Sequence, residues 1–299
     1  MSGLVGLAAA RIEFLRRIKA ELLFEKELKP GVLATLRAKG LPNNITHTIN
    51  VADIASASSC RIALEWGNRL PGTYGNYVTG QGSGSDFATI TQDFLKHGFE
   101  LLASLRSGEY HWRREHSVTH FDQYQHLALV SDALNSQPQL KAVFGEEYLI
   151  KPDITVGRVP VDPDSIGGRP AEPVARYASL LSDAALGSGK QIMLASVSCK
   201  LTIRSDRAQN TRTEALNLIR NRKGRTPAIV SVTAEPLPGR IASVAYGTGD
   251  IDCVYHAALY ELQQAVAAAM NDDQAEILET MVSGRRLRDL SDLVLDLMV

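Results

Sequence analysis

Four residues of the kinds used to hydrolyse phosphodiesters are far apart in the sequence and can meet in a folded chain: Asp153, Ser198, Lys200 and Glu214. Carboxylate oxygens bind a hard cation such as Mg2+, which activates water and neutralises the charge that develops on phosphorus. A neighbouring lysine orients the nucleophile or stabilises the negative charge. The set therefore fits a magnesium-dependent phosphodiester hydrolase. A structural Asp–Lys–Glu network in an unrelated α/β enzyme is the alternative.

Two elements must position these residues, and the first is a strand predicted over residues 191–204. Side chains of a strand alternate between its two faces. One face is the predicted core: Met193, Ala195, Val197, Cys199, Leu201 and Ile203. The other face becomes steadily more polar: Ile192, Leu194, Ser196, Ser198, Lys200, Thr202 and Arg204. The polar end of this strand is expected to point at something hydrophilic or charged.

The second element is a helix predicted over residues 206–222, with Ser205 as its N-cap and Gly224 as its stop. Residues spaced by three and four positions share a helix face. One such stripe consists of Arg207, Asn210, Thr211 and Glu214. Glu214 is therefore expected to face the same cleft as the start of the helix.

Arg204, Asp206 and Arg207 lie where this strand ends and this helix begins. An arginine fork matches guanine O6 and N7, and an aspartate accepts from cytosine N4, so the run suits a G·C-rich major groove. A helix cap with surface ion pairs is the alternative. Residues 196–240 carry nine basic and three acidic residues, whereas the whole chain has a net charge of −1. A local positive field is typical of a surface that meets a polyanion, and a solvated helical face is the other interpretation.

Several longer runs carry a family resemblance: SVSCKLTIRSDRAQN from Ser196, LNLIRNRKGR from Leu216, VTAEP from Val232, GTG from Gly247, IDCVYH from Ile251 and MVSGRRLRDLSD from Met281. They resemble the type II restriction endonucleases of the NgoMIV type, the PD…SCK…E branch of the PD-(D/E)XK nucleases. The resemblance is dense from about residue 148 onward. It implies a restriction-endonuclease-like α/β fold in which α-helices flank a central mixed β-sheet.

The resemblance also implies a role for each candidate residue. The implied catalytic residues are Asp153, Ser198 in the place of the usual acid, Lys200 and Glu214. The implied Mg2+ ligands are Asp153 and the main-chain carbonyl of Cys199. The implied DNA-reading residues are Arg204, Asp206 and Arg207 for an inner CCGG, Arg240 with Asp53 for the outer base pair, and Gln81 in the minor groove.

One position departs from the family pattern. A glutamate that completes the second metal site in the family corresponds here to Ala88. Three explanations stay open: Asp86 or Asp93 compensates, the alanine is an engineered substitution that disables cleavage, or the chain is naturally impaired.

The implied activity is Mg2+-dependent cleavage of double-stranded DNA at GCCGGC, after the first G, with a 5′ CCGG overhang. A sequence-specific DNA-binding protein with impaired cleavage is the alternative that Ala88 favours. A palindromic site requires a two-fold protein, and the resemblance suggests a homodimer that assembles into a homotetramer. A cognate DNA methyltransferase is expected in the same system.

Composition indicates a folded chain, since 44% of the residues are hydrophobic and 22% are charged. The absence of a long apolar run predicts a cytoplasmic protein without a membrane segment. We expect a single domain over residues 1–299, with an N-terminal helical part to about residue 145 and a catalytic and DNA-reading core beyond it. Scattered Cys60, Cys199 and Cys253 are expected to stay reduced.

The remaining elements follow from periodicity and breakers. Helices are predicted over residues 4–28, from 85 or 86 past 102, and over 121–134, 176–186 and 251–270. Strands are predicted over residues 148–159, 228–234 and 241–246. No metal site is expected at His111, His116, His120 or His126, because no H-E-x-x-H motif accompanies them. The C-terminal leucines 287, 290, 293 and 295 belong either to the core or to a subunit contact.

Overall fold

The computed structural model describes residues 3–76, 80–145, 149–168, 174, 178, 180–181 and 190–298, without the side chains of residues 80–81, 144 and 205–207. The chain divides into two compact units. Unit 1 comprises Met1–Leu105, Cys199–Thr211 and Ser231–Val299, and unit 2 comprises Arg106–Ser198 and Arg212–Val230. In the described ranges, no helix combines the length and the apolar character needed to cross a membrane. The single-domain organisation stays a prediction.

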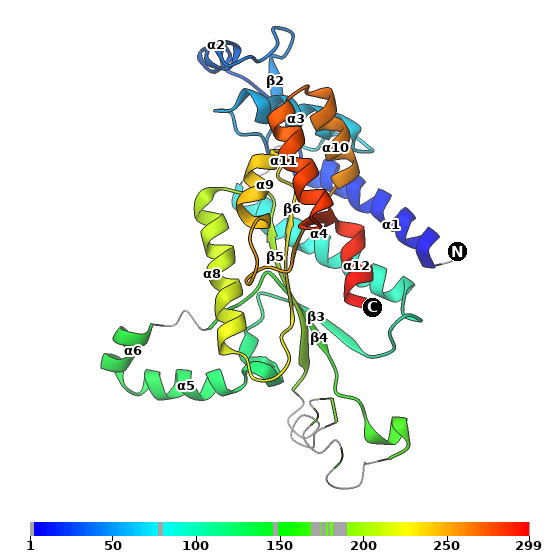
Figure 1. The fold of residues 1–299 in the computed structure, drawn as a ribbon, viewed down its shortest axis with the longest axis vertical. Coiled ribbons are helices and arrows are strands. Elements are labelled where there is room, and N and C mark those ends of the chain that lie inside the picture. The colour runs from blue at the N-terminus through cyan, green and yellow to red at the C-terminus, as the bar shows by residue number, and fades with distance from the viewer. Residues whose placement is uncertain are drawn as a thin grey trace. The chain divides into compact units, whose positions relative to one another are not determined.

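A six-stranded mixed sheet with the order β3-β4-β5-β6-β7-β8 is the main sheet, and β1 pairs with β2 in a second one (Figure 1). The strands are β1 (Glu25–Glu27), β2 (His47–Ile49), β3 (Tyr110–Arg114), β4 (Ile154–Arg158), β5 (Ile192–Lys200), β6 (Ala228–Thr233), β7 (Cys253–His256) and β8 (Leu287–Asp289). β4 is antiparallel to both β3 and β5, and β7 is parallel to β8. The α/β class with a mixed sheet, predicted from the sequence, is confirmed.

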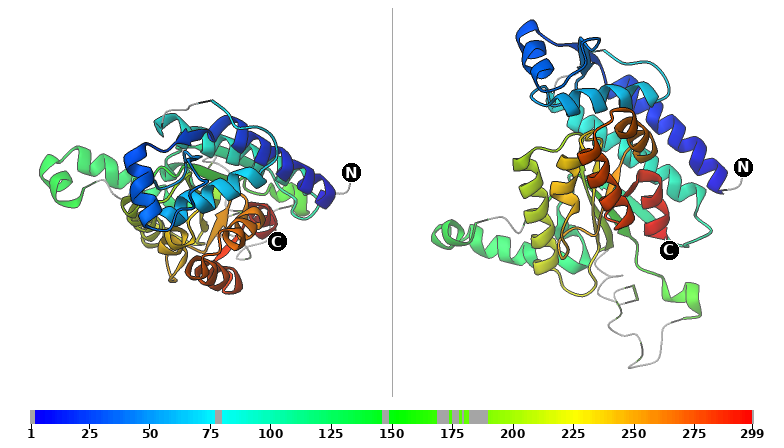
Figure 2. Two further views of the ribbon diagram at one scale, coloured as in Figure 1. Left: turned by 90° about the horizontal axis from the view of Figure 1, so that it is seen from above. Right: turned by 45° about the horizontal axis from the view of Figure 1, so that its top comes forward.

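Helices precede, separate and follow these strands along the chain. The α-helices are α1 (Gly3–Arg17), α2 (Pro30–Ala38), α3 (Ala57–Arg69), α4 (Gly80–Leu101), α5 (His126–Asn135), α6 (Pro138–Phe144), α8 (Ser205–Asn221), α9 (Pro238–Ala245), α10 (Leu259–Ala268), α11 (Asp272–Ser283) and α12 (Leu290–Met298). Shorter turns are the π-helix η1 (Ile18–Leu22) and the 3-10 helices η2 (Val118–His120), η3 (Asp122–Tyr124) and η4 (Pro163–Ile166). Within unit 2, α5 and α6 lie side by side as a helical hairpin in every view (Figure 2).

Each unit has its own apolar interior. In unit 1, Trp66 is fully buried, donates from Nε1 to Ala258 O at 3.3 Å, and meets the ring of His256 edge-on. In unit 2, Phe121 and Tyr124 are fully buried. Leu287, Leu290 and Leu293 are buried within unit 1, and of the two interpretations of the C-terminal leucines the core is the one that fits. The three cysteines are free and buried.

The strand and helix that carry the candidate site agree with prediction. β5 covers residues 192–200, and all of its predicted core residues from Met193 to Ile203 are buried. α8 begins at Ser205 and ends at Asn221. Gly224 then takes a left-handed φ of 74°, which suits a helix stop. β6 lies where a strand was expected, and α5 lies within the predicted helix but begins at His126 rather than at residue 121.

Two predictions near the C-terminus are wrong. Residues 241–246, predicted as a strand, lie largely in α9, since Pro238 occupies the first helical turn, where its missing N–H is no loss. The helix predicted over residues 251–270 is split into β7 and α10. A short apolar run does not distinguish a buried strand from a helix, and every residue of β7 is buried.

Element ends were also misplaced. The first helix ends at Leu22 rather than Leu28, because the Asn50 side chain bonds the Leu22 carbonyl and the Phe24 amide at 2.9 and 3.1 Å. α4 starts at Gly80, before the predicted residue 85, and β4 starts at Ile154, after the predicted residue 148. β3 was not predicted at all. The helix predicted over residues 176–186 lies almost entirely outside the described residues.

Candidate functional site

Asp153 and Ser198 are brought to one place by the pairing of β4 with β5. Ile154 pairs with Val197, and Thr155 pairs with Ser196 in antiparallel register. The same register continued by one residue puts Asp153 opposite Ser198, and directly opposed residues share a sheet face. The Asp153 carbonyl also accepts from Glu115 N at 3.4 Å. Asp153 therefore stands at the beginning of β4, on the face of the sheet that carries Ser198.

Ser198, Cys199 and Lys200 form the end of β5. Cys199 is buried on the core face, whereas Ser198 and Lys200 are half-buried on the other face, as the alternation predicted. Within the described residues, the Ser198 hydroxyl is buried without a hydrogen-bond partner. Buried hydroxyls nearly always have a partner, so an unsatisfied one next to Asp153 is consistent with a polar ligand at this position.

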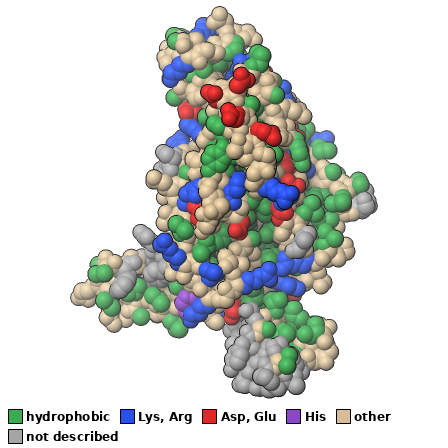
Figure 3. All heavy atoms as spheres, in the orientation of Figure 1, with side chains coloured by type: hydrophobic (Ala, Val, Ile, Leu, Met, Phe, Trp, Pro, Cys, Tyr) green, Lys and Arg blue, Asp and Glu red, His purple; other side chains and the backbone are tan. Residues whose placement is uncertain are grey.

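Glu214 lies on α8 and is half-buried. The buried stripe of α8 consists of Ala208, Thr211, Ala215 and Leu218, so Glu214 stands at the border of that stripe. Glu214, Asp153 and Ser198 all belong to unit 2. Lys and Arg side chains gather around the C-terminal end of this helix (Figure 3). The charge pattern of residues 196–240 predicted a cationic surface in this part of the chain.

Two positioning residues in unit 2 were missed from the sequence. Gln123 exchanges two hydrogen bonds with the Met193 backbone of β5, each at 2.8 Å. Tyr124 donates from its hydroxyl to the Leu218 carbonyl of α8 at 3.0 Å. Adjacent residues of η3 thus fix the strand that carries Ser198 and the helix that carries Glu214. No local pattern reveals this, since the partners are 70 and 94 residues away.

Arg204 follows β5 and is exposed. Its own carbonyl accepts from Ala208 N at 2.9 Å, which closes the first turn of α8. The amide of the preceding residue, Ile203, donates to Glu235 Oε2 at 2.9 Å. The backbone of Arg204 is therefore held on both sides while its side chain stays accessible.

Arg240 and Asp53 are 187 residues apart in sequence and form an ion pair in unit 1. Asp53 is fixed by its neighbours, since its Oδ1 accepts from Ala55 N at 3.0 Å and its amide donates to Ser59 Oγ at 2.9 Å. Glu235 Oε2 lies 3.9 Å from Arg240 Nη1. The looser part of the family resemblance joined Asp53 to Arg240, and the two side chains do lie in contact.

Glu235 is the most deeply buried acid of this group, and sequence reasoning did not single it out. Burial raises the pKa of its carboxyl to about 7, although bonds from Ile203 N and Leu237 N and the charge of Arg240 oppose the rise. His256 contacts the Glu235 carbonyl at 3.1 Å and accepts from Ala258 N at 3.1 Å. Its complete burial lowers the pKa of His256 to about 4, so the ring stays neutral.

Three DNA-reading candidates lie outside the described side chains: Gln81, Asp206 and Arg207. The departure at Ala88 is described. Ala88 is buried on α4, whereas Asp86 is exposed and Asp93 is exposed and bonded to Arg17 at 2.9 Å. Residues two and five positions away point about 160° and 140° from Ala88 around a helix. Neither aspartate therefore shares the face of Ala88.

The donors that the structure brings together are of the kind that Mg2+ prefers. Asp153 offers a carboxylate and the opposite Ser198 an unsatisfied hydroxyl, both hard oxygen ligands. The Cys199 carbonyl and the Glu214 carboxylate stay ligands that the family resemblance implies. In the described part of the chain, no three His, Cys, Asp or Glu side chains converge on one point. A set of two carboxylates, a carbonyl and a hydroxyl does not require such a group.

The histidines of unit 2 form local contacts. His116 and His120 stack with ring centroids 4.2 Å apart, and His111 lies 2.9 Å from Glu109. Burial and the neighbouring His120 and Arg113 lower the pKa of His116.

Comparisons with known proteins give two close matches and one distant one. The family model described as NgoMIV restriction enzyme matches residues 31–299. The type II restriction enzyme NgoMIV of Neisseria gonorrhoeae is 42% identical over 287 residues, which cover 93% of this chain and 96% of that protein. A crystal structure of the type IIF restriction endonuclease Bse634I with cognate DNA is 10% identical, with a TM-score of 0.31 and coverage of 87% of this chain and 92% of that one.

Proposed function

Because the chain belongs to the NgoMIV restriction enzyme family, it is a type II restriction enzyme, a site-specific deoxyribonuclease that binds DNA, and we propose that it cleaves GCCGGC with Mg2+. The proposed cut falls after the first G and leaves a 5′ CCGG overhang. One observation carries this proposal. The polar end of β5, with Ser198 opposite Asp153 and Lys200 next along the face, continues within four residues into the exposed Arg204.

In the proposed reaction, a water oxygen attacks phosphorus and the 3′ oxygen leaves, which gives 5′-phosphate and 3′-hydroxyl ends. Asp153 and the Cys199 carbonyl would hold Mg2+, which when bound supplies an activated water and positive charge. Lys200 would place its ammonium beside the attacked phosphate and stabilise the charge that develops there. Glu214 would supply the acid that the serine at position 198 lacks, and Ser198 would donate from its hydroxyl.

Sequence reading is proposed for two arginine groups. Arg204, with Asp206 and Arg207, would read the inner CCGG, since arginine bonds guanine in a bidentate manner and aspartate accepts from cytosine. Arg240, fixed by Asp53, would read the outer G·C pair, and Gln81 would contact the minor groove. The exposure of Arg204 and the half-exposed guanidinium of Arg240 support these roles.

We further propose a homodimer, because a palindromic site presents the same groups twice about a two-fold axis, and a homotetramer of two such dimers, which the family resemblance suggests. The described surface carries apolar side chains suited to a subunit contact on α5 and α6: Leu129, Val130, Leu140 and Val143. A cognate methyltransferase that protects the host's GCCGGC sites would accompany the enzyme in the cytoplasm.

A plasmid that carries GCCGGC, incubated with protein and Mg2+ beside the same plasmid with each site altered, tests the activity. Discrete fragments from the first plasmid alone are expected. Lys200→Ala should abolish cutting and preserve binding, and cutting by that variant would contradict the active-site assignment. Specific binding without cutting by the original chain would indicate a cleavage-impaired enzyme, as the alanine at position 88 suggests.

A further inference from the structure

We propose that Glu235 is a positioning residue that braces the two DNA-reading segments against each other, so that recognition of the inner and outer base pairs is set by one buried carboxylate. The inference rests on the proposed function of Arg204 and Arg240. Glu235 touches no DNA in this proposal, because its side chain is completely buried.

The first half of the brace is the bond from Ile203 N to Glu235 Oε2, at 2.9 Å. Ile203 is buried and Arg204 is the next residue, so this bond fixes the point from which the arginine leaves the protein. The Arg204 carbonyl is in turn bonded by Ala208 N. Without the carboxylate, the Ile203 amide would be a buried donor with no acceptor, and the segment would shift to satisfy it.

The second half of the brace is the bond from Leu237 N to Glu235 Oε1, at 3.1 Å. Leu237 is the residue that caps α9, and its carbonyl accepts from Arg240 N at 2.9 Å. Each carboxylate oxygen thus holds one reading segment, Oε2 the strand end and Oε1 the helix start. Charge adds a third contact, since Oε2 lies 3.9 Å from Arg240 Nη1.

The backbone of Glu235 is itself held by two side chains. Glu235 N donates to Thr233 Oγ1 at 3.1 Å, and the Glu235 carbonyl contacts the neutral ring of His256 at 3.1 Å. Both partners are fully buried. Because the backbone of Glu235 is fixed and each of its two carboxylate oxygens accepts from one segment, the side chain transmits any displacement of one segment to the other.

Glu235→Gln tests this directly, because an amide has nearly the same shape but only one acceptor oxygen for two backbone donors. We would measure kcat/KM on duplexes that carry GCCGGC, ACCGGT with the outer pair changed, and GCGCGC with the inner pairs changed. The ratio between duplexes is independent of the fraction of active enzyme, so a merely destabilised protein leaves it unchanged. We expect both ratios to fall about tenfold together, the loss of roughly one base-specific contact at each position.

Two controls make the result specific. Glu261→Gln makes the same change in the acid that pairs with Arg11 in unit 1, and should leave both ratios as they are. Arg240→Ala should relax the outer ratio alone. If Glu235→Gln does not fold, Glu235→Asp keeps the charge, is one methylene too short to reach both amides, and gives the same test.

Unchanged ratios in Glu235→Gln, or a loss confined to one base pair, would overturn the brace. Failure of the proposed recognition site is a separate outcome. If the original chain cleaves a different sequence, the two ratios are measured on the inner and outer pairs of that sequence. If it cleaves none, dissociation constants of the three duplexes in Ca2+ replace kcat/KM, and a joint loss is still the expected result.

Discussion

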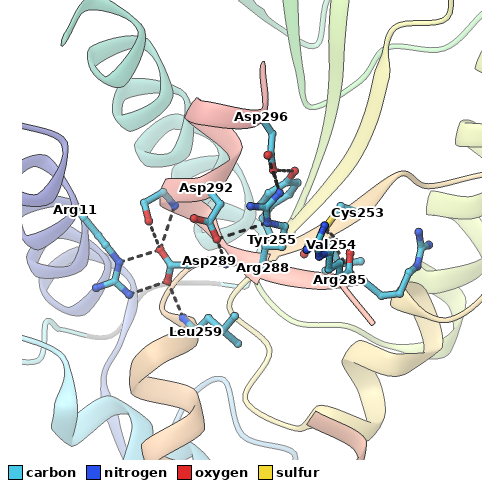
Figure 4. Close-up of polar contacts among 12 residues, drawn as sticks. Arg11, Cys253, Val254, Tyr255, Leu259, Arg285, Arg288, Asp289, Asp292 and Asp296 are labelled. Atoms are coloured by element: carbon cyan, nitrogen blue, oxygen red, sulfur yellow. Dashed lines mark hydrogen bonds and ion pairs between the residues drawn. The ribbon is translucent and has the colours of Figure 1, made fainter. Parts of the chain in front are cut away.

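Two arginine clusters of unit 1 have the same composition, one guanidinium and two carboxylates, but differ in how completely the guanidinium is bonded. The Arg11 cluster consists of Arg11, Glu261 and Asp289, and the Arg240 cluster consists of Arg240, Asp53 and Glu235. Arg11 bonds both of its acids in a bidentate manner, at 2.7 to 2.9 Å. Figure 4 shows Arg11 facing Asp289, which also accepts from the Leu259 amide. Arg240 bonds Asp53, and its second acid stays at 3.9 Å.

The guanidinium and its closer acid differ in exposure in the same direction, whereas the remaining acids do not, since Glu235 is 0% and Glu261 17% exposed. The side chain of Arg11 is 14% exposed and that of Asp289 is 1% exposed, whereas Arg240 and Asp53 are 31% and 26% exposed. Arg11 gives four of its five N–H donors to Glu261 and Asp289, so at most one is left for a base. The comparison therefore favours a structural role for the first cluster and supports the proposed recognition role of the second, although both have the same residue types.

The C-terminal run that resembles the family, from Met281, has bonds of the same structural kind as the Arg11 cluster. Arg286 donates three bonds to the carbonyls of Ala245, Ile251 and Asp252. Arg288 bonds Asp296, which also accepts from Tyr255 at 2.6 Å (Figure 4). The charged residues of this run hold β7, β8 and α12 together, and their resemblance to the family reflects a common scaffold.

The largest expected effect comes from adding an acid outside both clusters. Ala88→Glu restores the family's carboxylate at a buried position of α4 and should raise Mg2+-dependent cleavage about a hundredfold or more, since a completed metal site stabilises the transition state. Single-turnover cleavage of GCCGGC duplexes measures the change. Ala88→Gln is the control of similar size, and equal rates in all three proteins would refute the assignment.

The next largest effect is expected from a substitution in the Arg11 cluster. Asp289→Ala leaves Arg11 buried with half of its partners, which should lower the free energy of unfolding by about 3–5 kcal/mol. Urea unfolding checks the value. The specificity ratios of the protein that remains folded should not change, and a change in them would show that the two clusters are not separate in role.

The pH dependence of stability should have opposite signs in the two clusters. Burial raises the pKa of Glu235 to about 7 from its ordinary 4.5, so the native state binds the proton more tightly than the unfolded chain. The contribution of Glu235 to the free energy of unfolding should therefore fall as pH rises from 4.5 to 7, by roughly 3 kcal/mol in total, whereas His256, whose pKa burial lowers from 6.5 to about 4, contributes a slope of the opposite sign over much of this range. Arg240 and Asp53 are the charged groups that face this carboxyl.

Asp289 behaves in the opposite way. Burial pushes its pKa upward, but the bonds and charge of Arg11 outweigh burial and hold the pKa below its usual 3.8. Its contribution to stability is present above that pH and is lost as pH falls below it. Urea titrations across the acid and neutral range check both signs, and Glu235→Gln should remove the contribution of Glu235 alone, so that the free energy of unfolding of the variant rises more steeply with pH between 4.5 and 7 than that of the original chain. An unaltered slope would contradict the assignment to Glu235.

The smallest effect is expected from a substitution in the Arg240 cluster. Arg240→Ala should cost about 1–3 kcal/mol of discrimination at the outer base pair and change stability by less than about 1 kcal/mol, because its ion pair is partly solvated. Competition between GCCGGC and ACCGGT duplexes measures the first quantity, and thermal unfolding measures the second. A large loss of stability with intact discrimination would place Arg240 beside Arg11 as a structural residue.

These clusters also show what the sequence predicts and where it stops. The alternation of β5 predicted the burial of Cys199 and the polar face of Ser198 and Lys200, because a strand's periodicity is local. The brace at Glu235 was not predictable, since its partner Ile203 lies 32 residues away and only the fold joins them. The error at α9 has a local cause, because Pro238 was a helix-start signal that the apolar run after it concealed.

Because β5 continues directly toward Arg204, the backbone itself sets the spacing between Lys200 and Arg204. Three residues lie between Lys200 and Arg204, so their Cα atoms are at most about 14 Å apart even in an extended backbone. In the proposed reaction this limits how far the phosphate that Lys200 contacts can lie from the point where the Arg204 side chain leaves the backbone. Under the proposed function, a related enzyme with a residue inserted into or deleted from this interval would shift its cutting position relative to the bases that it reads. New specificities in this lineage are therefore expected to arise by exchanging side chains at fixed positions, with the interval kept at its present length.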